Sequence, residues 1–397
     1  MEEFEMPRVL IVPDLPLERW PSMDRYALRL VDGLAAEAPD VDVTLASDIN
    51  LLTAGTGEKT GGDRSAESVG LGSKAGKNEI RRYVSRYWSY PRRLKRHRAD
   101  LVHVLDHSYA HALSKIKTVP SLVTVHDLLP VLTVQRKSTG FRNDIRNRLL
   151  EWVLKELRRA TGWIVATEWL RTELAEWLGH SDRIHVIPYG VDEAFLEPPT
   201  QDRGEIRRRF NIPESAFVVL HVGSVGTRKN IGAVIATVDG LRRSGIEAWL
   251  LQVGGTFTAQ QMADIESRDL RSSLTAVGAA EESDLRLAYR AADVLLFPSH
   301  YEGFGFPVLE AMASELPAVN SGAGGLAEVS GDAAVIVRGR EVEPYVEAVS
   351  EIASNASRRE ELIRRGVEQA RKFRWAETAR KTAAVYRDLA APAASRA

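Results

Sequence analysis

The sequence predicts an α/β protein of two doubly wound domains that face a cleft, and three observations lead to this prediction. Strand and helix patterns alternate through both halves of the chain, which favours parallel sheets with right-handed crossovers. The 397 residues are enough for two domains of ordinary size. The run Pro198-Pro199-Thr200 interrupts the alternation and marks the crossing into a second domain.

Buried strands are expected at short apolar runs, and helices where apolar residues recur at helical spacing. In the first half the expected strands are 8–13, 41–45, 101–105, 121–125, 163–166 and 184–188. The expected helices there are 25–38, 78–98, 142–159 and 168–178. In the second half we expect strands at 218–222, 248–253, 274–277, 294–297, 318–319 and 334–337, with helices between them and a final helix from 373 to 389.

The composition is that of a soluble globular protein, with 44% apolar and 27% charged residues. A formal net charge of −1 gives no reason to expect nucleic acid as a partner. The chain has no cysteine, which excludes disulfides and fits a cytoplasmic protein. The acidic N-terminus does not look like a signal peptide, and no apolar run approaches the ~20 residues that span a bilayer. Asp40-Val41-Asp42 has the spacing of a metal-binding pair, but strand alternation gives the same spacing, so we expect no metal.

The strongest chemical signal follows the strand expected at 294–297. Gly303 and Gly305 lie in a loop, and Pro307 stands where a helix can begin, because its missing N–H costs nothing there. Backbone N–H groups and the positive end of a helix dipole suit a phosphate. Glu302 and Glu310 flank this point and suit the hydroxyls of a sugar and a ribose. The alternative is a strand–loop–helix corner with a solvated glutamate at each end.

A second stretch, after the strand expected at 218–222, offers positive charge. Gly223 and Ser224 follow this strand, and Gly223 lets the backbone approach a ligand closely. Arg228 and Lys229 place two cations at the start of the next helix, which suits a diphosphate. The alternative is a solvated basic turn.

The string Glu302-Gly-Phe-Gly-Phe-Pro-Val-Leu-Glu310 resembles the Glu-x7-Glu motif of retaining glycosyltransferases with the GT-B fold, in particular glycosyltransferase family 4. The resemblance implies an enzyme without metal or cofactor that takes a sugar from a nucleoside diphosphate, UDP before GDP. In this scheme Arg228 and Lys229 hold the diphosphate, Glu310 the ribose and Glu302 the sugar. The donor-binding residues that it implies are Gly223, Ser224, Arg228, Lys229, Val277, Gly278, Glu302, Gly303, Phe304, Gly305, Leu309 and Glu310.

The resemblance also assigns the domains and a histidine. Residues 1–195 would form a Rossmann-like acceptor-side domain and 196–372 a Rossmann-like donor domain, with the helix 373–390 crossing back to the first. His126, in His126-Asp127-Leu128, matches a family motif at the donor sugar, so the expected catalytic residues are His126, Glu302, Arg228 and Lys229. His107 also follows a strand and is an acceptor-side candidate, because ligands bind outside the carboxyl ends of parallel strands.

The segment Pro21-Ser22-Met23-Asp24-Arg25-Tyr26 departs from the family pattern. Relatives usually carry a Gly-Gly pair there, near the donor phosphates and the acceptor. Two interpretations remain open: Ser22 caps the helix, or Asp24 and Arg25 reach the acceptor.

Residues 79–98 combine aromatic residues at helical spacing with many arginines and lysines. Such a helix can lie on an anionic membrane surface, which would make the protein peripheral to the membrane and favour a lipid-linked saccharide as acceptor. Alternatively, its aromatic residues pack on the sheet and its arginines are solvated.

The sequence therefore predicts a retaining hexosyltransferase acting on a saccharide, lipid-linked saccharide or other hydroxyl acceptor, in polysaccharide or glycolipid synthesis. The resemblance implies a same-face mechanism, in which the leaving phosphate accepts the proton of the acceptor. The alternatives are a decayed protein that binds a nucleotide sugar without turnover, and a GT-B sugar epimerase.

Overall fold

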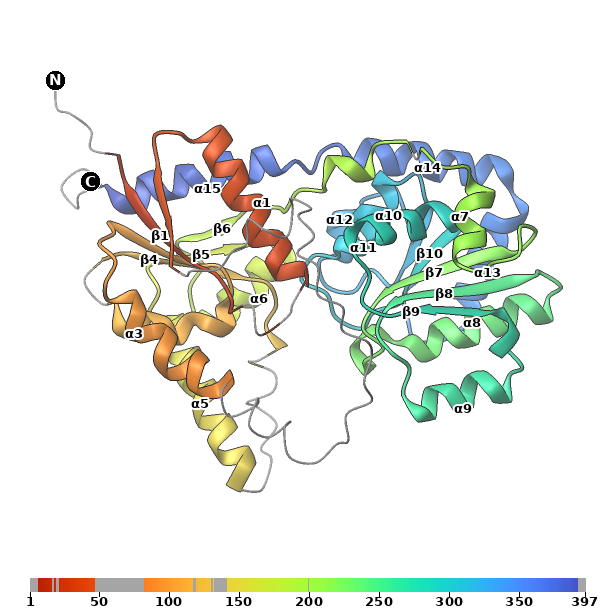
Figure 1. The fold of residues 1–397 in the computed structure, drawn as a ribbon, viewed down its shortest axis with the longest axis horizontal. Helices are drawn as coiled ribbons and strands as arrows, with labels where there is room; N and C mark the ends of the chain where they lie inside the picture. The colour runs from red at the N-terminus through yellow and green to blue at the C-terminus, as the bar shows by residue number, and fades with distance from the viewer. Residues whose placement is uncertain are drawn as a thin grey trace, which may run out of the picture. The chain divides into compact units, whose positions relative to one another are not determined.

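The structure is a computed structural model that describes residues 6–15, 18, 21–46, 82–116, 119–129, 131, 141–198 and 200–391. The chain divides into two compact units. Unit 1 comprises Met1–Ala166, Arg171–Tyr189 and Trp375–Ala397, and unit 2 comprises Thr167–Leu170 and Gly190–Arg374. In its described part each unit holds a parallel six-stranded sheet flanked by helices, which confirms the predicted α/β class (Figure 1).

The sheet of unit 1 has the strand order β2-β1-β3-β4-β5-β6. Its central strands β3 and β4 are buried at every residue, as parallel strands covered on both faces must be. Helices α1 and α15 cover one face, and α3 and α5 lie on the other (Figure 1). The strands are β1 (Arg8–Val12), β2 (Asp42–Leu45), β3 (Leu101–Val104), β4 (Ser121–Val125), β5 (Gly162–Val165) and β6 (Ile184–Val186). The helices are α1 (Pro21–Glu37), a π-helix η3 (Ser85–Ser89), α3 (Tyr90–Leu94), a 3-10 helix η4 (His107–Lys115), α5 (Phe141–Arg158), α6 (Glu168–Leu178) and α15 (Trp375–Ala390).

The sheet of unit 2 has the order β12-β11-β10-β7-β8-β9. Helices α8 and α9 lie on one side of it and α10 and α11 on the other (Figure 1). The strands are β7 (Phe217–Gly223), β8 (Ala248–Gly254), β9 (Leu274–Val277), β10 (Val294–Phe297), β11 (Ala318–Asn320) and β12 (Val335–Ile336). The helices are α7 (Arg203–Arg209), α8 (Ile231–Arg243), α9 (Ala259–Ser267), α10 (Glu282–Ala291), α11 (Phe306–Ala313), α12 (Leu326–Ser330), α13 (Glu343–Ser354) and α14 (Ala356–Ala370), with 3-10 turns η5 (Glu193–Phe195), η6 (Thr227–Lys229) and η7 (Arg271–Ser273).

Each sheet reverses its direction of growth at one point. In unit 1 the reversal falls between β1 and β3, and in unit 2 between β7 and β10. The loops that leave the two strands at such a point diverge, which opens space for a ligand at their carboxyl ends. The two reversals are therefore the first places to look for a site.

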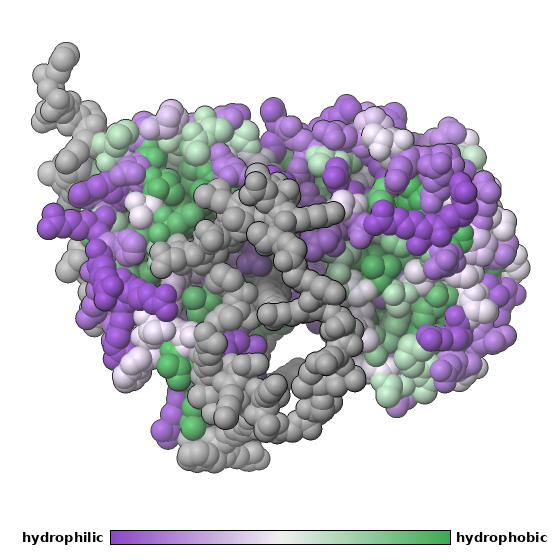
Figure 2. Space-filling model, viewed as in Figure 1, coloured by the Kyte–Doolittle hydropathy of each residue, from purple (hydrophilic) through white to green (hydrophobic). Residues whose placement is uncertain are grey.

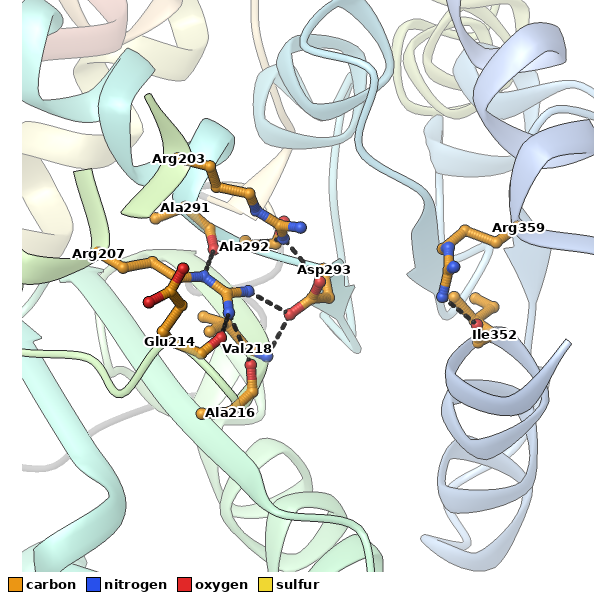
Figure 3. Close-up of polar contacts among 10 residues, drawn as sticks. All are labelled: Arg203, Arg207, Glu214, Ala216, Val218, Ala291, Ala292, Asp293, Ile352 and Arg359. Atoms are coloured by element: carbon orange, nitrogen blue, oxygen red, sulfur yellow. Dashed lines mark hydrogen bonds and ion pairs between the residues drawn. The ribbon is translucent and has the colours of Figure 1, made fainter. Parts of the chain in front are cut away.

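An ion pair between a buried arginine and a half-buried aspartate fastens α7 to the amino ends of β7 and β10. Arg207 donates to Asp293 Oδ2 at 2.7 Å, and the same oxygen accepts the N–H of Val218 at 2.7 Å (Figure 3). Arg207 also donates to the carbonyl oxygens of Ala291, Glu214 and Ala216. Because this network lies at the opposite end of the strands from their carboxyl ends, it supports the fold and not the site.

Two expected helices differ from the structure. The helix expected at 25–38 begins at Pro21, because proline suits a first turn, so Ser22 lies inside the helix and does not cap it. The helix expected at 78–98 is described only from residue 82, and its middle turn is π-helical. Residues 53–77, where a loop is expected, lie outside the described residues.

Hydrophilic side chains predominate on the visible face of both units (Figure 2). Among the described residues, no helix has both the length and the apolar content that crossing a bilayer requires.

Candidate active site

The reversal point of the unit 2 sheet brings two of the predicted stretches together. Strands β7 and β10 pair through Val219 and Val294. Arg228 and Lys229 follow β7, and Glu302 follows β10. These side chains, 73 residues or more apart in sequence, meet at one point.

Glu302 is the centre of this cluster. Lys229 donates from Nζ to Glu302 Oε1 at 2.7 Å, and Arg228 Nη1 lies 3.0 Å from the same oxygen. Arg228 Nη1 also donates to Tyr301 O at 3.0 Å, while His300 N donates to Arg228 O at 2.8 Å. The loops after β7 and β10 are thus joined by both side-chain and backbone bonds. Two cations around one carboxylate leave an excess of positive charge for an anion.

Lys229 is an unusual lysine because it is only 8% exposed. Burial lowers its pKa; the charge of Glu302 opposes this effect, and that of Arg228 adds to it. Its Nζ lies 4.5 Å from the centre of the Phe297 ring, which favours the charged form through a cation–π contact. A cation removed from water in this way interacts more strongly with an incoming anion than a solvated one does.

The loop from Glu302 to Gly305 leads into α11. Gly305 has a φ of +106° at the N-cap, a conformation that favours glycine, and Pro307 stands in the first turn. The helix begins at Phe306, so Glu310 lies in its second turn. Glu310 is 3% exposed, and its Oε2 accepts the hydroxyl of Tyr289 on α10 at 2.7 Å.

A second glycine-rich loop, after β11, packs against this one and was not predicted. Gly325 N donates to Glu302 O at 2.8 Å. A Cβ on Gly324 would lie 2.1 Å from the same carbonyl oxygen, so the loops approach too closely for any other residue. The signal in the sequence was available, since Gly322, Gly324 and Gly325 follow directly after an expected strand.

Another contact that the sequence did not indicate is made by Thr167. Its hydroxyl donates to Gly303 O at 3.0 Å and accepts the N–H of Leu170 at 3.2 Å. Thr167 therefore fixes the carbonyl of a predicted donor-binding residue, although it lies 136 residues earlier in the chain. No local pattern around Thr167 could have revealed this contact.

The remaining donor-side candidates are more dispersed. Gly223 ends β7 with a φ of +135°, and Ser224 after it is exposed. Val277 ends β9, which β8 separates from β7, and Gly278 O accepts the N–H of Gly254 at 3.1 Å. The structure therefore does not bring Val277 and Gly278 into the cluster around Glu302.

Two apolar candidates are packed. Phe304 is 4% exposed and contacts the rings of Phe306 and Phe373. Leu309 is fully buried. In this structure both side chains hold the loop in place.

In unit 1, His126 follows β4 and uses both ring nitrogens. Its Nε2 lies 2.8 Å from Leu105 O, so this nitrogen donates, and Nδ1 accepts the hydroxyl of Tyr189 at 2.6 Å. Burial lowers the pKa of His126, and the charge of Asp106 opposes this effect. The structure thus holds a neutral imidazole in a fixed orientation.

His107 follows β3, and its ring centre lies 6.5 Å from that of His126. The two histidines thus come together at neighbouring strand ends. Asp24 and Arg25 lie half-buried near the start of α1, and burial raises the pKa of Asp24.

The described part of the segment 79–98 matches neither interpretation completely, because it has an inward arginine and an outward tryptophan. Arg86 is inward: its Nη1 lies 2.9 Å from Glu18 Oε1, and its guanidinium is 4.4 Å from the centre of the Tyr109 ring. Trp88 is outward, 62% exposed, with the guanidinium of Arg92 3.8 Å from the centre of its ring. Residues 79–81 lie outside the described residues.

Solved structures with a similar fold include glycosyltransferases. Sucrose-phosphate synthase from Thermosynechococcus elongatus aligns with a TM-score of 0.70 and 20% identity over 96% of this chain and 99% of that one. Anabaena Alr3699/HepE, solved with UDP and glucose, aligns with a TM-score of 0.70 and 16% identity over 95% and 98%. The two doubly wound units, each with a parallel six-stranded sheet, therefore define a protein of the GT-B fold class.

The family follows from the sequence comparisons. Residues 202–369 match the family model described as Glycosyl transferases group 1, and residues 23–195 match the one described as Glycosyltransferase Family 4. The chain belongs to the family 4 glycosyltransferases. A curated relative, the D-inositol 3-phosphate glycosyltransferase of Acidothermus cellulolyticus, is 31% identical over 225 residues, which cover 53% of this chain and 49% of the relative. The chain spans about half the length of the curated relatives that it matches.

Proposed function

We propose that this protein transfers a hexose from a nucleoside diphosphate to a hydroxyl group, with retention at the anomeric carbon and without a metal or a cofactor. The observation that supports this proposal is the convergence of Arg228 and Lys229 on Glu302 Oε1 at the reversal point of the unit 2 sheet. On α11, the helix that follows the loop of Glu302, the side chain of Glu310 is oriented by Tyr289 of α10.

When the donor binds, its diphosphate would replace Glu302 as the partner of Arg228 and Lys229. Its phosphoryl oxygens compete with Glu302 for Arg228 and Lys229, since a diphosphate carries more charge than one carboxylate. Glu302 then becomes available for a hydroxyl of the sugar, and Glu310 binds the ribose. Among the bases UDP is the first choice, which the UDP complex of Alr3699/HepE supports.

The reaction would proceed on one face of the sugar. The bond between the anomeric carbon and the phosphate oxygen breaks, and a bond from that carbon to the acceptor oxygen forms. The acceptor proton passes to the leaving phosphate, whose growing negative charge Arg228 and Lys229 stabilise. The role assigned to His126 at the sugar stays a prediction, because its ring nitrogens are bonded to Leu105 and Tyr189.

We also propose that the segment 82–96 touches an anionic membrane and that the acceptor is a saccharide or a lipid-linked saccharide. Trp88 and Val84 are 62% and 52% exposed on one short helical segment. Arg92, Arg93, Lys95 and Arg96 on the same segment are exposed and suit lipid phosphates. An exposed indole beside several cations is typical of helices that bind a membrane interface.

A thermal-shift screen tests the donor site first. We expect one of UDP, GDP, ADP and TDP to raise the melting temperature equally with Mg²⁺ and with EDTA, because a ligand of the folded state stabilises it by mass action. Arg228→Ala and Glu310→Ala should lose the shift. Arg364→Ala, which removes an exposed arginine elsewhere in unit 2, is the matched control and should keep it.

The sugar donors of the selected base would then be assayed for slow hydrolysis and for transfer. Hydrolysis or transfer with a retained anomeric configuration supports the proposal. Binding without turnover of any sugar donor would favour the decayed binding protein, and interconversion of the sugar nucleotide would favour the epimerase. No shift with any nucleotide would contradict the proposed function.

A further inference from the structure

The reversal point of the unit 1 sheet carries two buried carboxyl groups, one after each of its two strands. Val12 on β1 and Val104 on β3 are register partners. Asp14 and Asp106 each follow two residues further along, at the carboxyl ends of these adjacent parallel strands. Asp14 is 7% exposed and Asp106 4% exposed. This is the same position in unit 1 that the cluster around Glu302 occupies in unit 2.

Asp106 is the carboxylate of this pair. Its Oδ1 accepts the N–H of Ser108 at 2.5 Å and lies 3.5 Å from Nδ1 of His107. Burial alone would raise the pKa of Asp106, but His107, His126 and the hydrogen bond from Ser108 bring it below its ordinary value. Asp106 therefore stays charged.

Asp14 is the member of the pair whose surroundings favour the protonated form. Neither of its carboxyl oxygens has a hydrogen-bond partner in the part of the chain that the structure describes. Burial raises its pKa well above the ordinary value, the negative charge of Asp106 adds to this rise, and Arg86 opposes it. A protonated carboxyl group can both donate and accept a hydrogen bond.

The backbone around Asp14 is fixed, so the group cannot easily turn away. Tyr90 donates its hydroxyl to Pro13 O at 2.8 Å, and Leu15 N donates to the hydroxyl of Tyr109 at 3.3 Å. Arg86, the cation that lowers the pKa of Asp14, already donates to Glu18 Oε1 at 2.9 Å and to Ser108 O at 2.8 Å. The protein thus holds the carboxyl group of Asp14 in place, while the neighbouring Arg86 is bonded to Glu18 and Ser108.

His107 is the second buried side chain here that lacks a hydrogen-bond partner among the described residues. It is 5% exposed, and neither ring nitrogen makes a hydrogen bond within the described residues. Its Nε2 lies 3.9 Å from Asp127 Oδ1, beyond hydrogen-bonding distance. Buried polar atoms are nearly always paired, and two exceptions beside the same carboxylate point to a missing partner.

We propose that Asp14 and His107 form a subsite that binds an uncharged, hydroxyl-bearing group, a sugar or a polyol. Hydroxyls suit it because a hydroxyl can both donate a hydrogen bond to these side chains and accept one from them. A phosphate does not suit it, since Asp106, Asp24 and Glu18 all act on Asp14 with negative charge. The subsite rests on the proposed function, in which it receives the acceptor, and it predicts an acceptor without phosphate at this position.

Ligand-observed saturation-transfer NMR on the full-length protein without nucleotide tests the subsite directly. The probes are glucose and myo-inositol, each compared with its phosphate ester. We expect signals from the two neutral compounds and weaker ones from the esters. Asp14→Ala and His107→Ala should each reduce the neutral signals about fivefold, the contribution of one hydrogen bond. Asp14→Asn should retain most of the signal, because an amide resembles a protonated carboxyl group.

Asp42→Ala is the control, since it removes an exposed carboxylate from the same sheet and should change nothing. Thermal melts with and without the selected nucleotide verify that each variant is folded and binds donor. Equal signals from wild type and Asp14→Ala, stronger signals from the esters, or no signal from any probe would overturn the subsite. If the nucleotide shift is absent while the polyol signal depends on Asp14, the proposed function fails and the subsite stands.

Discussion

Tyr289 donates its hydroxyl to Glu310 Oε2 at 2.7 Å, and both side chains are buried. The bond joins α10 to α11 and fixes one carboxylate oxygen of Glu310. This hydrogen bond holds the carboxyl group of Glu310 in one orientation, which is what binding a ribose hydroxyl requires.

We expect Tyr289→Phe to weaken nucleotide binding about tenfold. A hydrogen bond to a charged group contributes about 1.5–3 kcal/mol, and part of this free energy is lost from binding when Glu310 is no longer held in its orientation. Isothermal titration with the selected nucleoside diphosphate measures the effect. The matched control is Tyr345→Phe, which removes the hydroxyl that Tyr345 donates to Val337 O in the same unit. Equal affinities of Tyr289→Phe and wild type would show that Tyr289 has no part in donor binding.

The buried pair of Lys229 and Glu302 should be costly to break from one side. Lys229→Met leaves Glu302 without its nearest cation, and we expect it to lower the free energy of unfolding by about 3 kcal/mol. The double variant Lys229→Met/Glu302→Gln should lose less than the sum of the single variants, since neither charge is then left unpaired. Urea denaturation of the four proteins gives this coupling. Additive losses would mean that the two groups do not interact appreciably.

Gly324→Ala should be far more disruptive than Gly245→Ala. Both glycines have a positive φ, +63° and +88°, so the backbone penalty of about 1 kcal/mol is shared. At Gly324 the new Cβ would collide with Glu302 O at a distance of 2.1 Å. At Gly245 no atom lies within 4 Å of the new Cβ. We expect Gly324→Ala to lose the nucleotide-induced thermal shift and Gly245→Ala to keep it. Retention of the full shift by Gly324→Ala would contradict the close packing of the two loops.

Three buried histidines predict acid sensitivity. Burial lowers the pKa of His103 to about 3, and those of His111 and His221 to about 4. In the unfolded chain each titrates near 6.5, so the unfolded state binds more protons below that pH. Stability is complete above about pH 6.5 and falls as the pH approaches 4, by on the order of 3 kcal/mol for each histidine.

Urea denaturation at pH 7.5, 6 and 5 checks this pH dependence. His111→Phe keeps a ring among the aromatic neighbours of His111 and removes one titrating group, so its stability should depend less steeply on pH. His180→Gln, at an exposed position, is the control and should not change the slope. A free energy of unfolding that is constant from pH 7.5 to 5 would refute the prediction.

The membrane proposal depends on one exposed indole. We expect Trp88→Ala to reduce binding to vesicles that contain anionic lipid, and Arg93→Ala to reduce it mainly at low salt, because the charge term is screened. Cosedimentation with anionic and with neutral vesicles measures both. Arg364→Ala changes the charge by the same amount in unit 2 and should bind like wild type. Failure of the wild-type protein to bind anionic vesicles would rule out this partner.

Elements with a clear local sequence pattern were predictable, and those shaped by distant partners were not. The strands 121–125, 274–277 and 294–297 and the helix 168–178 were predicted with the bounds that the structure shows, since each is a short apolar run or a clear amphipathic repeat. The start of α1 was placed four residues late, because the proline at position 21 was assigned to a loop.

In the candidate site, too, local sequence patterns were predictable and contacts with distant residues were not. Arg228, Lys229 and Glu302 could be brought together in advance, because each follows a strand and the carboxyl ends of parallel strands share an edge. Tyr289 and Thr167 could not, since a hydroxyl on a helix or after a strand carries no sign of the distant group that it binds. Asp14 was missed because a single carboxyl group after a strand looks like any loop residue until its burial is known.

The assignment of Thr167–Leu170 to unit 2 affects any attempt to exchange halves between homologues. A chimaera joined only at the 190 and 374 boundaries would take Gly303 and Tyr301 from one parent and Thr167 and Trp169 from the other. Glu328 and the N–H groups of Glu168 and Trp169, which donate hydrogen bonds to it, would also come from different parents. Residues 167–170 must therefore come from the same parent as unit 2 if the recombined protein is to keep the loop from Glu302 to Gly305 intact.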